Sequence, residues 1–389
     1  MKFGLDLAPQ HKVYGAFAIY SFTMANIFPR FAEIQKSMGV EEGAFGFGLI
    51  GAPVGTLIAL TFAGPFLEKI GYRRAILALM PILSVCYALV TLAPNPVWFF
   101  ILLLLPGLTI GCIEIIVNLE ADRTEHLLGR RIMNRSHAFW SFGFFAAGFL
   151  GGTLAQSGLS PQLHLFGMIP VNFVLTFLLL GRFDPAPART IHQGESPRFA
   201  APTLGIMAIV IVTLAAMAME GGYADWSAIY MVNIYDSAPF VAALGVTLGA
   251  FSQGITRFFA DGFVERYSPT LVARVLLVIL SIGVALVFWP QGEYLSLLGF
   301  ALMGVGSSAI FPLAMSAAAQ RTDRPAAVNV AALAQTSFIV FMVAPPVLGF
   351  VAEHWGITWS FGVGLPLAIL GLFFSGALGR KPVPHSVDA

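Results

Sequence analysis

The sequence predicts an all-α membrane protein with twelve transmembrane helices. Of the 389 residues, 57% are hydrophobic and only 11% are charged, whereas soluble domains carry roughly 25% charged residues. A helix that spans a membrane needs roughly 20 mostly apolar residues, because each residue adds about 1.5 Å and the hydrocarbon core is about 30 Å thick. Twelve apolar runs of this chain come close to that length.

The twelve runs fall into two groups of six. The first group lies at 13–28, 45–67, 75–93, 97–117, 136–155 and 163–180. The second group lies at 204–219, 240–259, 271–288, 295–319, 328–352 and 357–378. Between them, prolines and scattered charges make the longest polar stretch, which is typical of a flexible linker. We therefore expect an N-terminal six-helix bundle at 1–181, a cytoplasmic linker at 182–202 and a C-terminal six-helix bundle at 203–389.

A loop between the second and third runs is repeated in the second half of the chain. Residues 64–74 read Gly-Pro-Phe-Leu-Glu-Lys-Ile-Gly-Tyr-Arg-Arg, and residues 261–268 read Asp-Gly-Phe-Val-Glu-Arg-Tyr-Ser. When the two segments are aligned, their charged dipeptides coincide, Glu68-Lys69 with Glu265-Arg266. This repeat indicates two halves that are built alike.

Both loops are candidates for a cytoplasmic gate. Glycines on either side of the Glu-Lys pair allow the first loop to turn tightly and dock against a neighbouring helix end. Arg257 and Asp261 are spaced i, i+4, which favours an ion pair on one helix face. We expect this pair to belong to the gate, and an Arg257 that binds an anionic substrate is the alternative. The expected gate residues are Gly64, Glu68, Lys69, Gly71, Arg73, Arg257, Asp261, Glu265 and Arg266.

Basic residues and tryptophans predict the orientation. All of the 21 Lys and Arg except Arg30 and Lys36 fall on or near one side of the predicted spans. Cytoplasmic loops carry the excess of basic residues, so both termini and the linker are expected in the cytoplasm of a bacterial-type inner membrane. Most tryptophans lie at predicted outer ends, as interfacial anchors do. These are Trp98, Trp226, Trp289, Trp355 and Trp359.

Several function classes are excluded. The net charge of +1, with basic residues scattered through short connections, argues against a nucleic-acid partner. The sequence contains no Walker loop, Ser/His/Asp arrangement or dinucleotide fingerprint, so neither an enzyme nor ATP-driven transport is expected, and no cofactor is required. Cys86 and Cys112 lie inside apolar runs without metal-ligand spacing, so no metal site is expected.

Twelve spans in two groups of six, a long cytoplasmic linker and the 64–74 loop resemble the major facilitator superfamily of secondary transporters. The family pattern prefers Asp-Arg where this chain has Glu68-Lys69, and Arg where it has Tyr72. The charges are kept, but some of the forked hydrogen bonding of arginine is lost. The resemblance covers essentially the whole chain. It implies two six-helix bundles around a central cavity that opens alternately to either side, in a monomer.

Three further stretches resemble the branch related to fucose permeases and sugar-transporter-like membrane proteins. They are Gly-Cys-Ile-Glu-Ile-Ile-Val-Asn at 111–118 with the 131–143 segment that follows, Glu-Gly-Gly-Tyr-Ala-Asp-Trp-Ser at 220–227, and Gly-Val-Gly-Ser-Ser-Ala-Ile-Phe-Pro at 304–312. By this resemblance, Glu114 stands at the buried carboxylate that handles protons in fucose permeases. The acidic residue that those permeases carry on the first helix is Ala25 here, with Asn26 beside it.

The carboxylates within the spans are candidates for proton coupling. An ionisable side chain in hydrocarbon costs at least about 2.5 to 3.5 kcal/mol, so it normally faces a partner or a watery cavity. Glu114 lies inside an apolar run, where it either loads and releases a proton or bonds an adjacent helix end. Glu220, near the expected outer end of the seventh span, is either a second proton or gate carboxylate or an interfacial residue. Asp225 and Trp226 are interpreted as the cap and anchor of that end.

Solute-binding candidates must be polar or aromatic and near the middle of the membrane. Amides suit hydroxylated ligands because they both donate and accept hydrogen bonds, and aromatic rings can stack on a sugar or a flat apolar ligand. Each residue can instead serve packing or inter-helix bonding, and Asn118 can instead orient Glu114. His137 is interpreted as a structural cytoplasmic residue. The candidates are Asn26, Asn118, Tyr20, Trp140, Asn172, Gln253, Gln335 and Phe311.

The sequence therefore predicts a secondary active transporter whose partners are a proton, the lipid bilayer and a small polar solute such as a sugar or sugar derivative. Few charged residues other than Glu114 and Arg257 are expected in the cavity, which together with the amides favours this solute class. A proton-driven exporter of amphipathic compounds is the first alternative. The second alternative is a non-transporting membrane scaffold or sensor built on the same helices.

Overall fold

The computed structural model describes residues 4–130, 132–187 and 200–379, and its regular secondary structure over these ranges is entirely helical. The first half contains α1 (Pro9–Ala25), η1 (Phe28–Arg30), α2 (Phe31–Met38), α3 (Glu42–Leu49), α4 (Gly51–Phe62), α5 (Gly64–Ile70), α6 (Tyr72–Val90), α7 (Pro96–Leu128), α8 (Met133–Gln156) and α9 (Pro161–Leu180). The second half contains α10 (Leu204–Tyr235), α11 (Pro239–Arg266), α12 (Pro269–Phe288), α13 (Glu293–Ser307), α14 (Ile310–Ala319), α15 (Ala326–Trp355), α16 (Ile357–Gly362), α17 (Gly364–Phe374) and η2 (Ser375–Leu378).

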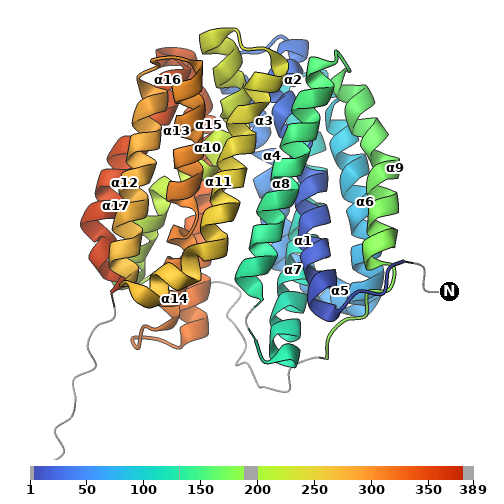
Figure 1. Ribbon diagram of the computed structural model, residues 1–389, viewed down its shortest axis with the longest axis vertical. Coiled ribbons are helices and arrows are strands. Elements are labelled where there is room, and N and C mark those ends of the chain that lie inside the picture. The colour runs from blue at the N-terminus through green and yellow to red at the C-terminus, as the bar shows by residue number, and fades with distance from the viewer. Residues whose placement is uncertain (1–3, 131, 188–199, 380–389) are drawn as a thin grey trace, which may run out of the picture.

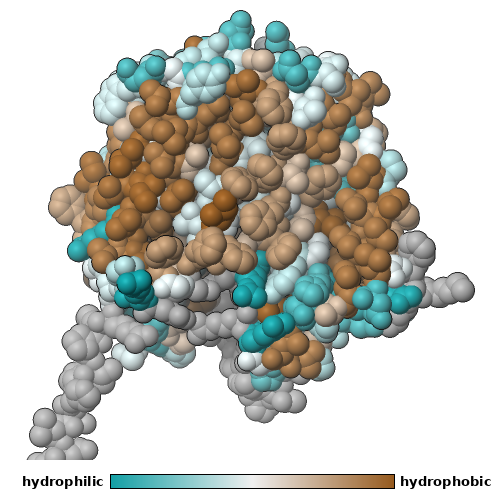
Figure 2. Space-filling view, viewed as in Figure 1, coloured by the Kyte–Doolittle hydropathy of each residue, from teal (hydrophilic) through white to brown (hydrophobic). Residues whose placement is uncertain are grey.

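These helices confirm the predicted fold class. Eleven segments of the described chain are long and apolar enough to cross a membrane. The twelfth, α1, has 17 residues, and η1 follows it closely. Figure 1 shows two bundles side by side, with the first half on the right and the second half on the left. Figure 2 shows hydrophobic side chains across the middle of one face and hydrophilic ones at both ends, as a membrane-spanning surface requires.

Three spans are interrupted rather than continuous. The span at Glu293–Ala319 breaks between α13 and α14. Pro312 lies in the first turn of α14 and has no N–H, so it cannot bond the carbonyl of Ser308 four residues earlier. The other interrupted spans are α3 with α4 and α16 with α17. The break at Ser308 leaves a backbone acceptor free inside the membrane-spanning region.

The seventh span is longer than the sequence analysis predicts. It was expected at 204–219, but α10 continues for 32 residues to Tyr235. Trp226 is therefore not an interfacial anchor at the outer end, since its side chain is 0% exposed in the core. The prediction for Trp226 is wrong because the seventh span was expected to end near residue 219, whereas the helix continues through the glycines that follow Glu220. The exposed tryptophans are Trp98, Trp289, Trp355 and Trp359.

The two bundles meet most closely at the end that carries α2 and α16, at the top of Figure 1. The backbone N–H of Gly43 donates to Glu353 over 3.0 Å, and Asn233 donates to Glu42 over 2.8 Å. Phe240 donates its N–H to the Gln156 side chain over 3.2 Å. These hydrogen bonds join opposite bundles, so this end is closed.

Glycines allow the bundle backbones to touch at the closed end. A Cβ added at Gly46 would lie 2.6 Å from the carbonyl of Pro345, and one at Gly349 would lie 2.5 Å from the carbonyl of Glu42. Along the α8–α11 contact, Gly148 similarly packs on Thr247. Small residues are the usual means of close helix approach in a membrane, where lipid provides no hydrophobic drive between helices.

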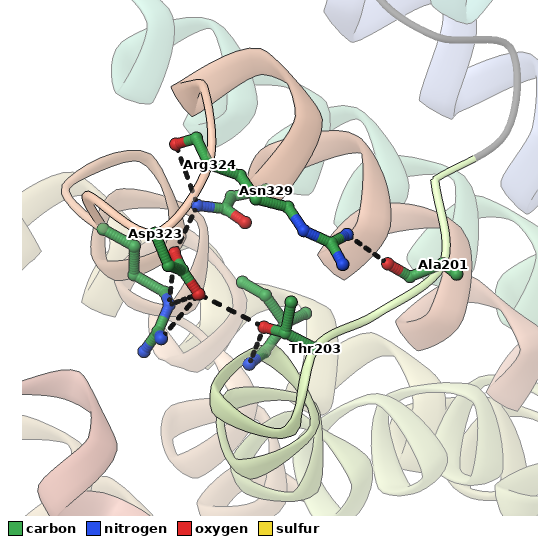
Figure 3. A network of polar contacts seen from close by, with 7 residues as sticks. Ala201, Thr203, Asp323, Arg324 and Asn329 are labelled. Atoms are coloured by element: carbon green, nitrogen blue, oxygen red, sulfur yellow. Dashed lines mark hydrogen bonds and ion pairs between the residues drawn. The ribbon is translucent and has the colours of Figure 1, made fainter.

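The end of the linker is bound to the second bundle by a polar network (Figure 3). Asp323 receives hydrogen bonds from Arg321, Asn329 and the Thr203 hydroxyl, and Arg324 donates to the carbonyl of Ala201 over 2.8 Å. Thr203 also accepts from the N–H of Ile206, which caps the start of α10. The predicted linker residues 188–199 lie outside the described residues, and the bundle boundaries at 181 and 203 remain predictions.

Candidate solute cavity

A cavity of about 680 Å³ lies between the two bundles. The first half lines it mainly with residues of α1, α4, α7 and α8, with single residues from η1, α2, α3 and α6, and the second half lines it with residues of α10, α11, α14 and α15. Most of the wall is apolar and aromatic, and few polar side chains reach it. Its charged and titratable side chains include Glu114, Glu220, Asp225, Arg257 and His137. A largely apolar cavity with a few convergent polar groups is the usual form of a small-molecule site.

Glu114 lies in the cavity wall on α7 and is held by neighbouring side chains. Asn118, one helical turn further along, donates to its carboxylate over 2.7 Å and to its backbone carbonyl over 2.9 Å. Tyr20 on α1 is a second polar neighbour of the same carboxylate. The carboxylate therefore has a fixed position and faces the cavity between two helices of the first bundle.

Arg257 on α11 is positioned by a backbone group and a carboxylate. Its Nε donates to the Ser308 carbonyl over 2.8 Å, the acceptor that Pro312 leaves free. Its Nη2 lies 3.3 Å from the carboxylate of Glu220 on α10. The Arg257 side chain is 16% exposed and that of Glu220 is 24% exposed. Arg257 thus joins α11 to α10 and to the break between α13 and α14 at the cavity wall.

Asp225 and His137 are cavity residues that the sequence analysis interpreted as structural. Asp225 was expected to cap a helix end, but it lies within α10 and lines the cavity. His137, expected at a cytoplasmic position, lines the cavity from α8 and packs edge-on against Phe17. Two acidic residues, Glu220 and Asp225, on one uninterrupted apolar helix were the sequence signal that could have placed Asp225 in the cavity. The signal was missed because the helix was expected to end at residue 219.

The predicted solute-binding residues separate into two groups. One group lines the cavity and consists of Tyr20, Asn118, Trp140, Phe311 and Gln335. In the other group, Asn26 bonds His164 over 3.0 Å, Asn172 donates to Ser84 over 3.0 Å, and Gln253 donates to Ser307 over 3.3 Å. These three amides are buried and serve contacts within one bundle, although a role in binding solute stays a prediction for each.

The predicted gate residues lie at the linker end, except Arg257 in the cavity wall. Gly71 has a φ of +86° and ends α5. Arg73 donates to the carbonyls of Gly181 and Phe183 over 2.6 and 2.7 Å, and therefore docks on the end of α9. Glu68 accepts a long hydrogen bond of 3.5 Å from Tyr72.

The remaining gate residues add few contacts. Lys69 is in the last turn of α5, which begins at Gly64. Arg266, at the end of α11, lies over the ring of Tyr267. The side chains of Asp261 and Glu265 lie outside the described part of the structure. Whether these positions form a gate remains a prediction.

The family comparison identifies the architecture around this cavity. The family model of the Major Facilitator Superfamily matches residues 13–338 and 209–389 of the chain. The chain belongs to the major facilitator superfamily. It is accordingly a multi-pass integral membrane transporter and not an enzyme.

Individual relatives agree with this membership. An uncharacterized transporter, y4wD of Sinorhizobium fredii, is 29% identical over 355 residues, which cover 89% of this chain and 92% of the relative. The crystal structure of a mutant of the nucleoside transporter NupG has a TM-score of 0.75 at 13% identity, and the match covers 95% of this chain and 99% of NupG. The E. coli fucose:proton symporter FucP has a TM-score of 0.58 at 17% identity, with 96% and 98% covered. At these identities the two structures show the fold alone.

The described residues offer no candidate metal centre. No group of three or more His, Cys, Asp or Glu side chains is arranged to hold a metal ion in the part of the chain that the structure describes. The chemistry of the cavity therefore rests on its carboxylates, its ion pair and its aromatic wall.

Proposed function

We propose that this member of the superfamily is a proton-coupled secondary transporter that works by alternating access and moves a small polar solute such as a sugar or sugar derivative. One observation carries the proposal. A fixed carboxylate, Glu114, faces a central cavity that contacts between the bundles close at one end. A group that binds a proton there changes the charge of the solute chamber itself.

Glu114 is the proton-binding residue in this proposal. Asn118 and the neighbouring Tyr20 hold the carboxylate in the cavity wall. Glu220 is the second candidate, and its charge is balanced by Arg257 while the ion pair lasts. The names of the similar structures, a nucleoside transporter and a fucose:proton symporter, support solutes of this kind.

We also propose that the open end of the cavity faces the cytoplasm of a bacterial inner membrane. Both described ends of the linker, at 182–187 and 200–202, and α5 lie at the end opposite the closed contacts (Figure 1). Basic residues concentrate on that side of the sequence, and cytoplasmic loops carry such an excess. The structure then corresponds to an inward-open state of a monomer.

A second candidate function is the proton-driven export of amphipathic compounds. The observation that favours it is the aromatic wall of the cavity, to which Phe28, Phe144, Trp140, Phe311 and Phe338 contribute. Such a surface binds flat apolar molecules as well as the faces of sugar rings.

A proteoliposome experiment distinguishes the two functions. Vesicles containing the full-length protein receive an inward proton gradient together with labelled fucose, xylose, uridine or glucosamine, or with an amphipathic fluorescent dye. Accumulation of a labelled solute supports the first function, and expulsion of the dye supports the second. If neither compound class responds to the gradient, the proposal of proton-coupled transport is wrong.

The role of Glu114 is tested in the same vesicles. Glu114→Gln should abolish gradient-driven accumulation and preserve exchange of labelled for unlabelled solute. Glu125→Gln is the matched control, because Glu125 is on the same helix, lies outside the cavity and accepts backbone hydrogen bonds at the turn to α8. If gradient-driven accumulation persists in Glu114→Gln, another group binds the proton.

A further inference from the structure

Acidic side chains outnumber basic ones in the cavity wall. Its wall contains three carboxylates, on Glu114, Glu220 and Asp225, and one guanidinium, on Arg257. The Arg257–Glu220 ion pair balances two of these charges. The acidic side chains that remain outside this pair are one from each bundle, Glu114 from the first and Asp225 from the second.

Asp225 differs from the other two carboxylates in its surroundings. Glu114 receives a hydrogen bond from Asn118, and Glu220 pairs with Arg257. Among the described residues, Asp225 has no hydrogen-bond or ion-pair partner, and Tyr87 on α6 of the opposite bundle is within range of its electrostatic influence. The carboxylate is therefore available to a molecule that enters the cavity.

The other titratable groups of the cavity do not satisfy Asp225. Arg257 on α11 already bonds the Ser308 carbonyl and Glu220. Glu220, on the same helix, has the same charge sign, as does Glu114 on α7. His137, on α8, packs edge-on against the ring of Phe17. A carboxylate without a partner in the membrane is costly, so an occupant of the cavity should supply the missing positive charge.

The walls around these carboxylates suit an organic cation. Tyr20, Tyr87 and Trp140 line the cavity from the first bundle, opposite α10. Aromatic faces attract ammonium groups within about 6 Å, and the attraction grows when the site excludes water. Since no metal-binding cluster is present among the described residues, an inorganic divalent cation has no comparable site.

We propose that the transported solute carries a protonated amine and that Asp225 is the counter-ion that binds it. This inference rests on the proposed function, because it assigns the solute to the same cavity. Glu114 then remains the site of the coupled proton. The solute bridges the bundles, with its ammonium on Asp225 of α10 and its body against the aromatic side chains of the first bundle. An amino sugar has both the amine and the hydroxyl groups that Asn118 and Gln335 can bond.

Matched pairs of compounds test this inference on the purified full-length protein. Thermal stability is measured with glucosamine against glucose and N-acetylglucosamine, with galactosamine against galactose, and with 2-phenylethylamine against 2-phenylethanol. The amines should raise the melting temperature at neutral pH, and the neutral members of each set should raise it less or not at all. A ligand that binds the native state stabilises that state by mass action, so the shift in melting temperature reports the affinity of the compound.

Variants assign the effect to one carboxylate. Asp225→Asn should weaken amine binding by about tenfold or more, because the charge pair is lost, and Asp225→Glu should restore most of it. Asp236→Asn is the control, since Asp236 is exposed at the end of the same helix with φ of +50°, a conformation that asparagine tolerates. Its amine binding should equal that of the wild type.

Four results would overturn the inference. In the first, the wild type binds amines and their neutral partners equally, and in the second it binds no amine of the panel. In the third, amine binding survives Asp225→Asn. In the fourth, Asp225→Asn removes the dependence of transport on the proton gradient without any effect on amine binding. The last result would make Asp225 a second proton site only. A different result separates the two proposals. If amine binding depends on Asp225 but transport does not respond to a proton gradient, the proposed proton coupling is refuted and the inference about the amine stands.

Discussion

Glu353 on α15 accepts a hydrogen bond of 3.0 Å from the backbone N–H of Gly43 on α3. The two residues belong to opposite bundles, and the Asn233–Glu42 bond reinforces their contact from α10. Both bonds lie at the closed end of the cavity. They must break before that end can open, so their strength contributes to the balance between the two access states.

Removing these bonds should shift that balance. In Glu353→Ala with Asn233→Ala, each lost bond weakens closure by about 1 kcal/mol, or roughly fivefold in population. The measurement is the reaction rate of a cysteine placed at Leu49, in a protein without Cys86 and Cys112, with a thiol reagent added from the closed side. Glu293→Ala is the control, because the Glu293–Ser237 bond lies at the same end within one bundle. Equal rates in the control and the double variant would contradict the prediction.

A steric substitution should act on the same equilibrium more strongly. The methyl groups of Gly349→Val would collide with the backbone of Glu42, because even a Cβ lies 2.5 Å from its carbonyl. We expect the closed end to open and transport to fall by at least about tenfold, since one access state becomes inaccessible. Gly167→Val on α9, where an added Cβ meets nothing within 4 Å, should transport normally. Wild-type activity in Gly349→Val would show that the contact is dispensable.

The Arg257–Glu220 pair should behave as a coupled unit. Arg257→Gln leaves the Glu220 carboxylate without its cation, and we expect a loss of about 1 to 3 kcal/mol in the free energy of unfolding. Glu220→Gln should cost less, because the amide oxygen still accepts from Arg257. The double variant should be more stable than Arg257→Gln alone, and a double-mutant cycle in thermal or denaturant unfolding measures this coupling. Strict additivity would mean that the two side chains act independently.

Asn26 provides a test that separates stability from solute binding. Its carboxamide bonds His164 over 3.0 Å and the Phe22 carbonyl over 2.6 Å. Asn26→Ala should lower the free energy of unfolding by about 1 to 3 kcal/mol, because buried partners lose their bonds. The KM for solute should remain unchanged, whereas Asn118→Ala should alter coupled transport. A raised KM in Asn26→Ala would support its predicted role in solute binding instead.

Asp323 should make stability depend on pH at the linker end. Hydrogen bonds and charge from Arg321, with a further bond from Asn329, hold the pKa of its carboxyl well below the usual range. A lowered pKa in the folded state means stabilisation that is complete above the unfolded pKa of about 4 and is lost as pH falls toward the folded value. Asp323→Asn should therefore lower the melting temperature at pH 7, and the difference from wild type should shrink in acid. A difference that grows in acid would contradict this sign.

Much of the fold could be predicted because span length and charge distribution are local properties of the sequence. The apolar runs around Phe288 and Leu180 end where the helices end, since the chain there turns to polar or capping residues. The predicted end of the seventh span was wrong, because the helix continues through Glu220, Gly221 and Gly222. Polar and small residues in soluble proteins mark helix ends, but inside a membrane they can line a cavity within a continuous helix.

The site could be predicted only in part because it depends on which helix face meets the cavity. Glu114 was identified, since an isolated acidic residue in an apolar run needs a polar environment. Asn26 and Asn172 are also polar residues within apolar runs, but they bond His164 and Ser84 inside one bundle. The contact of Arg257 with Glu220 joins residues 37 positions apart, and no local pattern specifies which partner an arginine reaches.

The break at Pro312 has a consequence for protein engineering. Because a backbone carbonyl at Ser308 and the carboxylate of Glu220 both hold Arg257, the arginine does not depend on the aromatic side chains of the cavity wall for its position. The aromatic positions around it can then be varied in a library while the basic residue stays fixed. A recombinant transporter with altered cargo preference is best sought by randomising Phe311 and Trp140 and retaining the proline.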